Sequence, residues 1–426
     1  MDYNQNNNRQ YYNPNNMNGQ STYPNGSYGQ YNAQNYMGNQ QGYNPNYPQG
    51  YNQGYGQNYP QQPYAQNYNQ GYTQCYYTQQ NPFYGQPVNG QQYAVNHQRN
   101  LRLMEHKREI KKFSVTFAVA MLGFLIASYL LSFFLMAFDL MALYENNSAF
   151  ASSVGIFYSF AAVGAPFFFA YIYLKKQKLF PESGKTIYSA PKLSLKTFSI
   201  IFMSVLGCLA SMYLTGIITV FFNAIGYEFT GGPEPEVNGI ADLVALFVGT
   251  AIVPPLVEEF AMRNVLMQSL RKYGNLFAIL ASAFCFGIFH GTPGQIPFAF
   301  LCGLFIGYAV VATESIWTGV IIHLIVNGLS CSYYAATYFT DEDTGDHIYY
   351  IILAVLGVLG GISAFIYLIK YKSEFKRILS VKGVSEYSTR EKFGKFICTP
   401  VMIIAIIVFV IEAILCIQPI TSGFTS

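Results

Sequence analysis

From residue 113 onward the chain is a series of long apolar segments separated by short polar loops. A bilayer core offers no water to backbone groups, so segments of this length and apolarity are expected to cross it as helices, which pair their own N–H and C=O groups. With 51% hydrophobic and only 11% charged residues, the chain is too poor in charge for an ordinary soluble protein. We predict an all-α polytopic membrane bundle of about eight or nine transmembrane helices. The expected spans are roughly residues 113–138, 151–174, 198–222, 240–262, 276–291, 297–312, 315–335, 348–369 and 399–418.

The distribution of basic residues predicts the orientation of these spans. Lys and Arg precede the first span and occur in the loops after the second, fourth and eighth spans, whereas the loops on the opposite side contain none. Because cytoplasmic loops carry the excess of Lys and Arg, we place the N-terminal side in the cytoplasm of a multi-pass protein of the cell membrane. The basic residues flank spans and form no nucleic-acid patch, so the bilayer is an expected partner and nucleic acid is not.

Residues 1–98 have a different composition, dominated by Asn, Gln, Tyr, Gly and Pro, with Asp2 and Arg9 as their only Asp, Glu, Lys or Arg. The few aliphatic side chains of this segment cannot bury enough surface to offset the conformational entropy lost on folding. We therefore expect a disordered cytoplasmic tail, followed by a membrane domain over 99–426. The first residues, MDYNQNNNRQ, lack the features of a signal peptide. The first span is therefore expected to direct membrane insertion.

The stretch PPLVEEFAMR, residues 254–263, places two glutamates and an arginine inside an apolar segment. An ionised side chain at the centre of a bilayer raises the free energy by about 2.5–3.5 kcal/mol, so such a cluster is a functional-site hypothesis by default. Only two histidines, His290 and His323, fall within predicted spans. Gly274 lies midway between Glu258 and His290. If the flanking segments are antiparallel helices, these two side chains are level, each about 24 Å from the turn.

The two adjacent glutamates need not share one role. Glu259 and Arg263 are four residues apart and are expected to pair on one helix face, whereas Glu258 points about 100° away. A carboxylate without a local cation in a low dielectric is a candidate general base. Pro254 and Pro255 remove two backbone donors and predict a kink with free carbonyl groups, which membranes tolerate only where it faces protein or water. We therefore expect a hydrated cavity beside Glu258.

Three motifs follow one another on successive spans that carry polar groups: EExxxR at Glu258–Arg263, FxxxH at Phe286–His290 and HxxxN at His323–Asn327. Together they resemble the signature of the CPBP intramembrane proteases, the family of the type II CAAX prenyl endopeptidase and the bacterial Abi proteins. The resemblance covers about residues 200–335 and implies an endopeptidase that acts on a membrane-associated or lipidated peptide or protein. The roles it implies are activation of a water molecule by Glu258 and His290, an oxyanion hole from His323 and Asn327, and support from Glu259 and Arg263.

A zinc site is the alternative chemistry, because two histidines and one glutamate match a catalytic zinc shell. Its ligands would be Glu258, His290 and His323. The chain has no HExxH motif and the nearby asparagine is a poor zinc ligand, so we expect no metal or other cofactor and a mechanism that depends on glutamate.

Two functions outside hydrolysis also fit intramembrane Glu and His. A proton-coupled transporter would use them as a relay, although we find no inverted repeat. A non-catalytic scaffold or immunity-type protein would tolerate Glu258→Gln, whereas a protease would lose turnover and keep its fold. Glu412, alone in the last predicted span, matches no motif.

Overall fold

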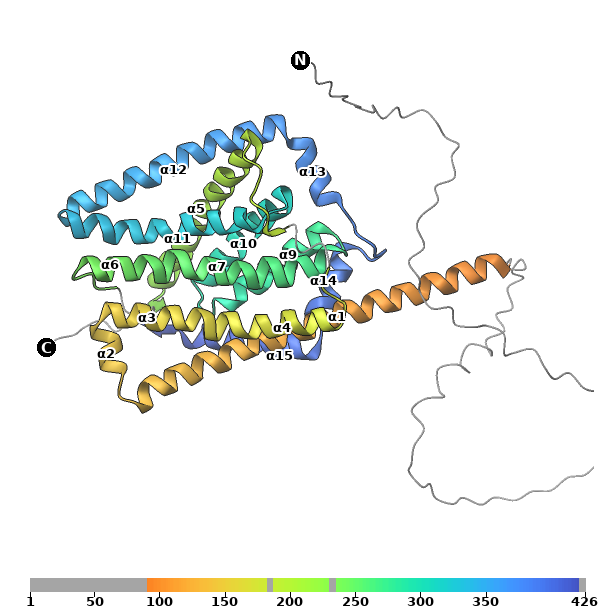
Figure 1. The fold of residues 1–426 in the computed structure, drawn as a ribbon, viewed down its shortest axis with the longest axis horizontal. Coiled ribbons are helices and arrows are strands. Elements are labelled where there is room, and N and C mark those ends of the chain that lie inside the picture. The colour runs from red at the N-terminus through yellow and green to blue at the C-terminus, as the bar shows by residue number, and fades with distance from the viewer. Residues whose placement is uncertain (1–89, 182–186, 230–234, 421–426) are drawn as a thin grey trace, which may run out of the picture. The chain divides into compact units, whose positions relative to one another are not determined.

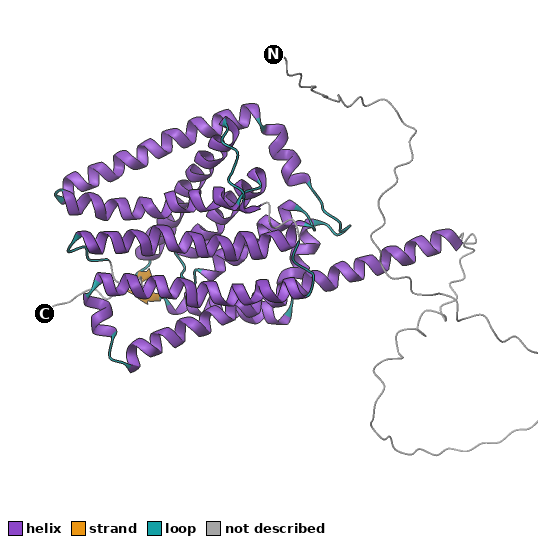
Figure 2. Ribbon diagram, viewed as in Figure 1, coloured by secondary structure: helices purple, strands orange, loops and turns teal. Residues whose placement is uncertain are grey.

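The computed structural model describes residues 90–181, 187–229 and 235–420, nearly all of which are helical (Figure 2). Residues 1–89 of the expected tail lie outside the described residues, whereas residues 90–98, also predicted to be disordered, form the start of a helix. The all-α membrane fold is confirmed. Within the described ranges seven helices are long and apolar enough to cross a membrane, or eight if one bent pair counts as a single span.

Helix α1, Gly90–Ala137, extends away from the bundle at its N-terminal end (Figure 1). Its 48 residues correspond to about 72 Å, more than twice the roughly 30 Å of a hydrocarbon core, so its polar N-terminal part lies outside the lipid. A π-helical stretch at Ser159–Gly164 joins α3 to α4, which together form one candidate span. The helices that follow α1 are α2 (Met141–Asn146), α3 (Ser148–Tyr158), α4 (Ala165–Lys176) and α5 (Leu195–Ala224).

The middle of the bundle is one helical segment, Ile240–Arg271, whose α-helix is interrupted by two π-helical stretches. It lies between the row formed by α11 and α12 and the row formed by α3, α4 and α1 (Figure 1). Its parts are α6 (Ile240–Leu246), a π-helical stretch (Phe247–Ile252), α7 (Val253–Glu259), a second π-helical stretch (Phe260–Met267) and α8 (Gln268–Arg271).

Helix α9, Asn275–Phe289, is the most enclosed element of the next group. It has 15 residues, about 22 Å, which is shorter than the hydrocarbon core, and most of these residues are buried. The segment expected as the fifth span is therefore a short helix inside the bundle. A Cβ added at Gly303 of α10 would lie 2.9 Å from the Cα of Ala283, so this glycine lets α9 and α10 approach closely. The helices that follow are α10 (Gln295–Thr313), α11 (Ile316–Phe339) and α12 (Glu342–Lys370).

The C-terminal elements close the bundle. Helices α14 and α15 meet at a bend of 75° and form the pair that counts as a possible eighth span. A short antiparallel pairing of β1 with β2 sets Tyr227 opposite Pro419 and joins the segment after α5 to the segment after α15. The bounds are α13 Lys372–Ser380, α14 Thr389–Ile397, α15 Pro400–Leu415, β1 Tyr227–Phe229 and β2 Ile417–Pro419.

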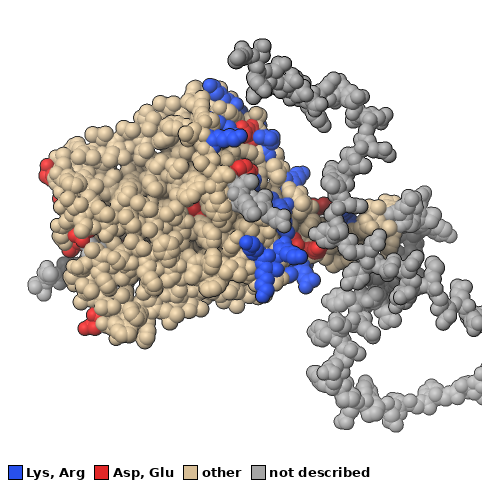
Figure 3. All heavy atoms as spheres, viewed as in Figure 1, with Lys and Arg blue, Asp and Glu red and all other residues tan. Residues whose placement is uncertain are grey.

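Basic side chains gather at one end of the face shown in Figure 3, where α4 ends and where α12 runs into α13. The opposite end of that face carries acidic side chains and no basic ones. The loops predicted to share one side of the membrane by their Lys and Arg content therefore lie at one end of the bundle. We call this the basic end.

The turn between α8 and α9 lies at the basic end, and we call Lys272, Tyr273, Gly274, Asn275 and Lys392 the turn cluster. Gly274 has φ +121°, and a Cβ there would lie 2.8 Å from the carbonyl oxygens of Val381 and Lys382. The buried Lys392 ammonium donates to the carbonyl oxygens of Tyr273 at 2.6 Å and Lys382 at 2.7 Å. Burial, together with a hydrogen bond to Glu109, raises the pKa of the Tyr273 hydroxyl, which therefore stays protonated.

Candidate active site

A cavity of about 290 Å³ opens inside the bundle between the segment 240–271 and helices α5, α9, α10 and α11. The four residues predicted to do the chemistry all line this cavity, although they come from three separate helices. Its lining residues are Cys208, Thr250, Glu258, Phe286, His290, Gln295, Phe298, Ala299, Cys302, Ile306, His323, Val326, Asn327 and Ser330.

Two prolines shape the wall of the cavity on the side of the segment 240–271. The carbonyl oxygen of Thr250 would accept from residue 254 in an α-helix or from residue 255 in a π-helix, and both residues are prolines without an N–H group. The side chain of Asn327 on α11 replaces that donor, with Nδ2 at 3.0 Å from the Thr250 oxygen. An amide nitrogen has two N–H groups, so this contact orients Asn327 and leaves a second donor.

Glu258 presents a carboxylate to the cavity without a hydrogen-bond partner. Its Oε2 atom is buried and accepts no hydrogen bond from any described residue. The nearest cationic candidate is Nε2 of His323 at 3.8 Å, beyond hydrogen-bond distance, and the Glu258 side chain is 15% exposed. An unpaired buried polar oxygen raises the free energy of the folded state by about 1–3 kcal/mol, more when it is charged. A water molecule in the cavity would supply the missing partner.

The ring of His290 is held by its own helix end. Its Nδ1 atom lies 2.7 Å from the carbonyl oxygen of Phe286, and a carbonyl oxygen only accepts, so Nδ1 carries the proton. In the neutral ring, Nε2 then keeps its lone pair and is the atom able to accept a proton. The ring of Phe286 packs edge-on against His290, with centroids 4.7 Å apart, and fixes the ring plane.

The predicted ion pair of Glu259 and Arg263 is present, and Glu259 also contacts His323 of the site. Arg263 Nη1 lies 3.0 Å from Glu259 Oε1, and both side chains are fully buried. Oε1 of Glu259 is also 3.1 Å from Nδ1 of His323, so the supporting glutamate orients one of the predicted oxyanion donors. The Arg263 guanidinium lies over the Phe286 ring, 4.5 Å from its centroid. A Cβ at Gly319 of α11 would lie 2.6 Å from Glu259 Oε2, which explains the small residue there.

Residues 240–329 match the family model described as type II CAAX prenyl endopeptidase Rce1-like. This match confirms the resemblance to the CPBP family. The comparison with curated proteins found no match, and neither did the comparison with solved structures. The matched segment runs from α6 into α11, so it contains every residue named in the three motifs and lies within the core expected at about 200–335.

Several residues of this cavity were not predicted from the sequence. Thr250 could have been predicted, since it lies four residues before the first proline of the pair and its carbonyl oxygen therefore lacks the usual helical donor. Gln295, in the first turn of α10, and Ser330, one turn after Asn327, carry no comparable signal. Cys208 of α5 and Cys302 of α10 both line the cavity, which the scattered spacing of the cysteines does not indicate.

The side chains of Glu258, His290 and His323 are the alternative zinc ligands, and their placement bears on whether they could hold a metal ion. Among the residues that the structure describes, no group of three or more His, Cys, Asp or Glu side chains gathers closely enough to hold a metal ion. The alternative ligand set Glu258, His290 and His323 therefore does not fit a three-ligand zinc site as it is placed. The Nδ1 atoms of both histidines are engaged, one with a carbonyl oxygen and one with Glu259, so only Nε2 of each ring could face a metal ion.

Proposed function

We propose that the protein is an intramembrane endopeptidase that hydrolyses a peptide bond of a membrane-associated substrate in the cavity lined by Glu258. The match to CAAX-type endopeptidases supports the reaction class. The observation that carries the proposal is the unpartnered Oε2 of Glu258 in a cavity shared with His290, His323 and Asn327. A cavity of about 290 Å³ lies at the small end of ligand pockets, so it suits a peptide bond and its neighbours and leaves any lipid chain of the substrate outside.

The first step is the activation of water. Glu258 accepts a proton from a water molecule that also donates to Nε2 of His290, and the water oxygen forms a bond to the carbonyl carbon of the peptide. The electron pair of the C=O π bond moves to the carbonyl oxygen, which becomes the oxyanion. Two acceptors on one water raise its nucleophilicity and fix its direction of attack.

The second step is stabilisation and collapse of the oxyanion. The second N–H of Asn327 and the Nε2–H of His323 are donors on one face of α11. Nδ1 of His323 lies 3.1 Å from Oε1 of Glu259, and this contact holds the ring so that Nε2 is the nitrogen left to face the substrate. On collapse the C–N bond breaks, and the leaving amine takes the proton held by Glu258.

Proteolysis of membrane-anchored peptides by the purified full-length protein, followed by mass spectrometry, tests this function. We expect Glu258→Gln to lower the cleavage rate by about 10²- to 10⁴-fold, whereas Glu412→Gln, the matched change at another intramembrane glutamate, leaves it within about twofold. Cleavage should survive a chelator. Cleavage by Glu258→Gln at the normal rate would refute the role of this residue, and loss of cleavage in the chelator would favour zinc.

The orientation is part of the proposal. We infer that the basic end faces the cytoplasm, because cytoplasmic segments carry the excess of Lys and Arg. The described start of α1 then lies on the cytoplasmic side.

A further inference from the structure

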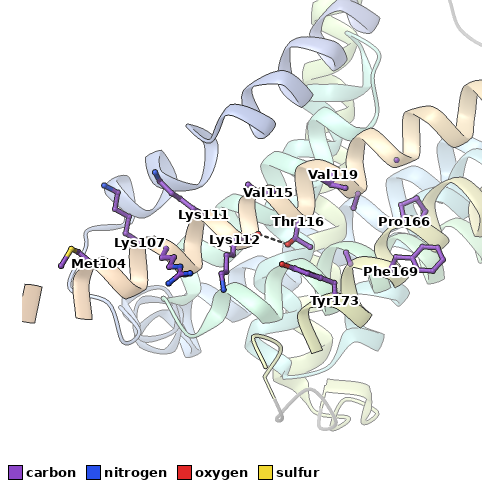
Figure 4. A pocket seen from close by; sticks show the side chains of 14 residues that line it. Met104, Lys107, Lys111, Lys112, Val115, Thr116, Val119, Pro166, Phe169 and Tyr173 are labelled. Carbon is purple, nitrogen blue, oxygen red and sulfur yellow. Dashed lines mark hydrogen bonds between the residues drawn. The ribbon is translucent and has the colours of Figure 1, made fainter. Parts of the chain in front are cut away.

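A groove of about 910 Å³ runs along the outside of the bundle between α1 and α4, remote from the cavity just described (Figure 4). None of the residues that line the groove lines the cavity. The α1 residues recur every three or four positions from Met104 to Gly123, so they form one face of that helix. The α4 wall extends from Pro166 to Tyr173.

The two ends of the groove differ in chemistry. Towards the basic end, four cationic side chains of α1 line it: Lys107, Arg108, Lys111 and Lys112. Further along, its walls are apolar and include Val119, which is 56% exposed, and Phe169, which is 67% exposed. The groove ends where α1 meets α4, since a Cβ at Gly123 would lie 3.4 Å from the Cβ of Pro166.

The four cations have no anionic partner in the part of the chain that the structure describes. No ion pair joins any of them to a described acidic residue, and no Asp or Glu lines the groove. Glu109, on another face of α1, pairs instead with Lys272 at 2.8 Å. Four like charges within two turns of one helix repel each other, so an anion between them would be stabilised.

The depth of the cations matches the headgroup layer. The apolar part of α1 begins at Phe113, and the four cations lie within about 9 Å before it along the helix axis. The headgroup region on each side of the hydrocarbon core is roughly 5–7 Å thick. From Val115 to Gly123 the groove then continues for about 12 Å, close to the roughly 15 Å of one hydrocarbon leaflet.

We propose that this groove binds one anionic phospholipid of the leaflet that meets the basic end. Its phosphate contacts Lys107, Arg108, Lys111 and Lys112, and one acyl chain packs between Val119 and Phe169. A zwitterionic lipid is disfavoured, because the groove offers no acidic side chain to its positive group. Basic pockets between helices at this level are suited to anionic headgroups. The site does not depend on the proposed protease activity.

Fluorescence quenching tests the site in the full-length protein. The only tryptophan, Trp317, is replaced by Trp317→Phe, and Val119→Trp, or Phe169→Trp as a second reporter, places an indole in the groove. The protein is reconstituted in phosphatidylcholine vesicles that contain equal fractions of brominated phosphatidylglycerol or brominated phosphatidylcholine. We expect the groove to prefer phosphatidylglycerol by at least about fivefold, the effect of one basic residue near the headgroup.

Charge-removing variants decide whether the groove is responsible. Replacing Lys107, Arg108, Lys111 and Lys112 with Gln should abolish the preference. The matched set Lys370→Gln, Lys372→Gln, Lys376→Gln and Lys382→Gln removes the same charge from the same end and should preserve it. Equal quenching by both lipids, or equal loss in both variant sets, would overturn the proposal. So would reversal of the quenching by a farnesylated peptide with a neutral backbone, since the groove would then hold a substrate lipid.

Discussion

The segment 240–271 and α9 form a hairpin that carries buried polar groups both at its turn and beside the cavity, and the hydrogen bonding of these groups differs between the two places. In the turn cluster, Lys392 donates to two carbonyl oxygens, and the Asn275 side chain donates to the carbonyl oxygen of Ile378 at 2.9 Å. At the cavity end, Glu258 keeps a carboxylate oxygen without a partner.

This difference distinguishes buried polar groups that stabilise the fold from buried polar groups that remain available for a reaction. A satisfied buried network rigidifies the fold, whereas an unsatisfied group destabilises it and persists only where something else requires it. At the turn, nearly every donor named above has an acceptor, so a ligand has nothing to bind. In the cavity, Glu258 of α7, His290 at the end of α9 and Asn327 of α11 are the groups that the proposed reaction uses.

A double-mutant cycle at Glu258 and His290 is the strongest test of the claim that the cavity groups act in the reaction. Glu258→Gln and His290→Gln should each lower kcat by about 10²- to 10⁴-fold. Since both groups act on one water molecule, the double variant should be no more than about tenfold slower than the slower single variant. Single-turnover cleavage of a membrane-anchored peptide measures these rates. Losses that multiply in full would mean that the two residues serve separate steps.

Asn327→Ala should give the next largest effect. It removes the donor to the Thr250 oxygen and the second N–H proposed to stabilise the oxyanion, and loss of one such donor lowers kcat by about 10²- to 10³-fold. KM should stay nearly constant, because the oxyanion exists only after attack. Ser332→Ala on the same helix is the control and should leave kcat unchanged. A rise in KM at constant kcat would instead assign Asn327 to substrate binding.

Lys392→Met tests the turn cluster, and its effect should be on stability alone. The variant leaves the carbonyl oxygens of Tyr273 and Lys382 without their donor, each worth about 1–3 kcal/mol of the free energy of unfolding. Thermal unfolding in detergent should show a clear fall in Tm, while kcat of the folded fraction stays normal. Lys376→Met, at an exposed position of α13, should change the free energy of unfolding by less than about 0.5 kcal/mol. A loss of kcat in Lys392→Met at normal Tm would mean that the turn cluster contributes to the reaction, and would contradict its assignment to stability alone.

The sequence predicted the cavity better than the turn cluster, for a physical reason. Helix spacing and the position of Gly274 are local features, and they predicted that Glu258 and His290 come together; both line one cavity. The contact of Lys392 with Tyr273 joins residues 119 positions apart, and helix periodicity does not encode it. The short length of α9 was missed for a similar reason, because apolarity alone does not distinguish a helix that faces lipid from one enclosed by other helices.

Glu412 gives the smallest expected effect and defines a third kind of polar group. The sequence offers no role for it, and the structure supplies a partner, because the hydroxyl of Tyr129 on α1 donates to its carboxylate. Tyr129 is exposed and Glu412 half-buried on the outside of the bundle, within candidate spans, where a hydrogen bond between helices contributes about 0.6 kcal/mol on average. Glu412→Gln keeps an acceptor for the tyrosine, so the free energy of unfolding should fall by less than about 1 kcal/mol, with kcat unchanged. Chemical unfolding and peptide cleavage measure both quantities, and a large loss of kcat would extend the chemistry beyond the cavity and erase the contrast with the turn cluster.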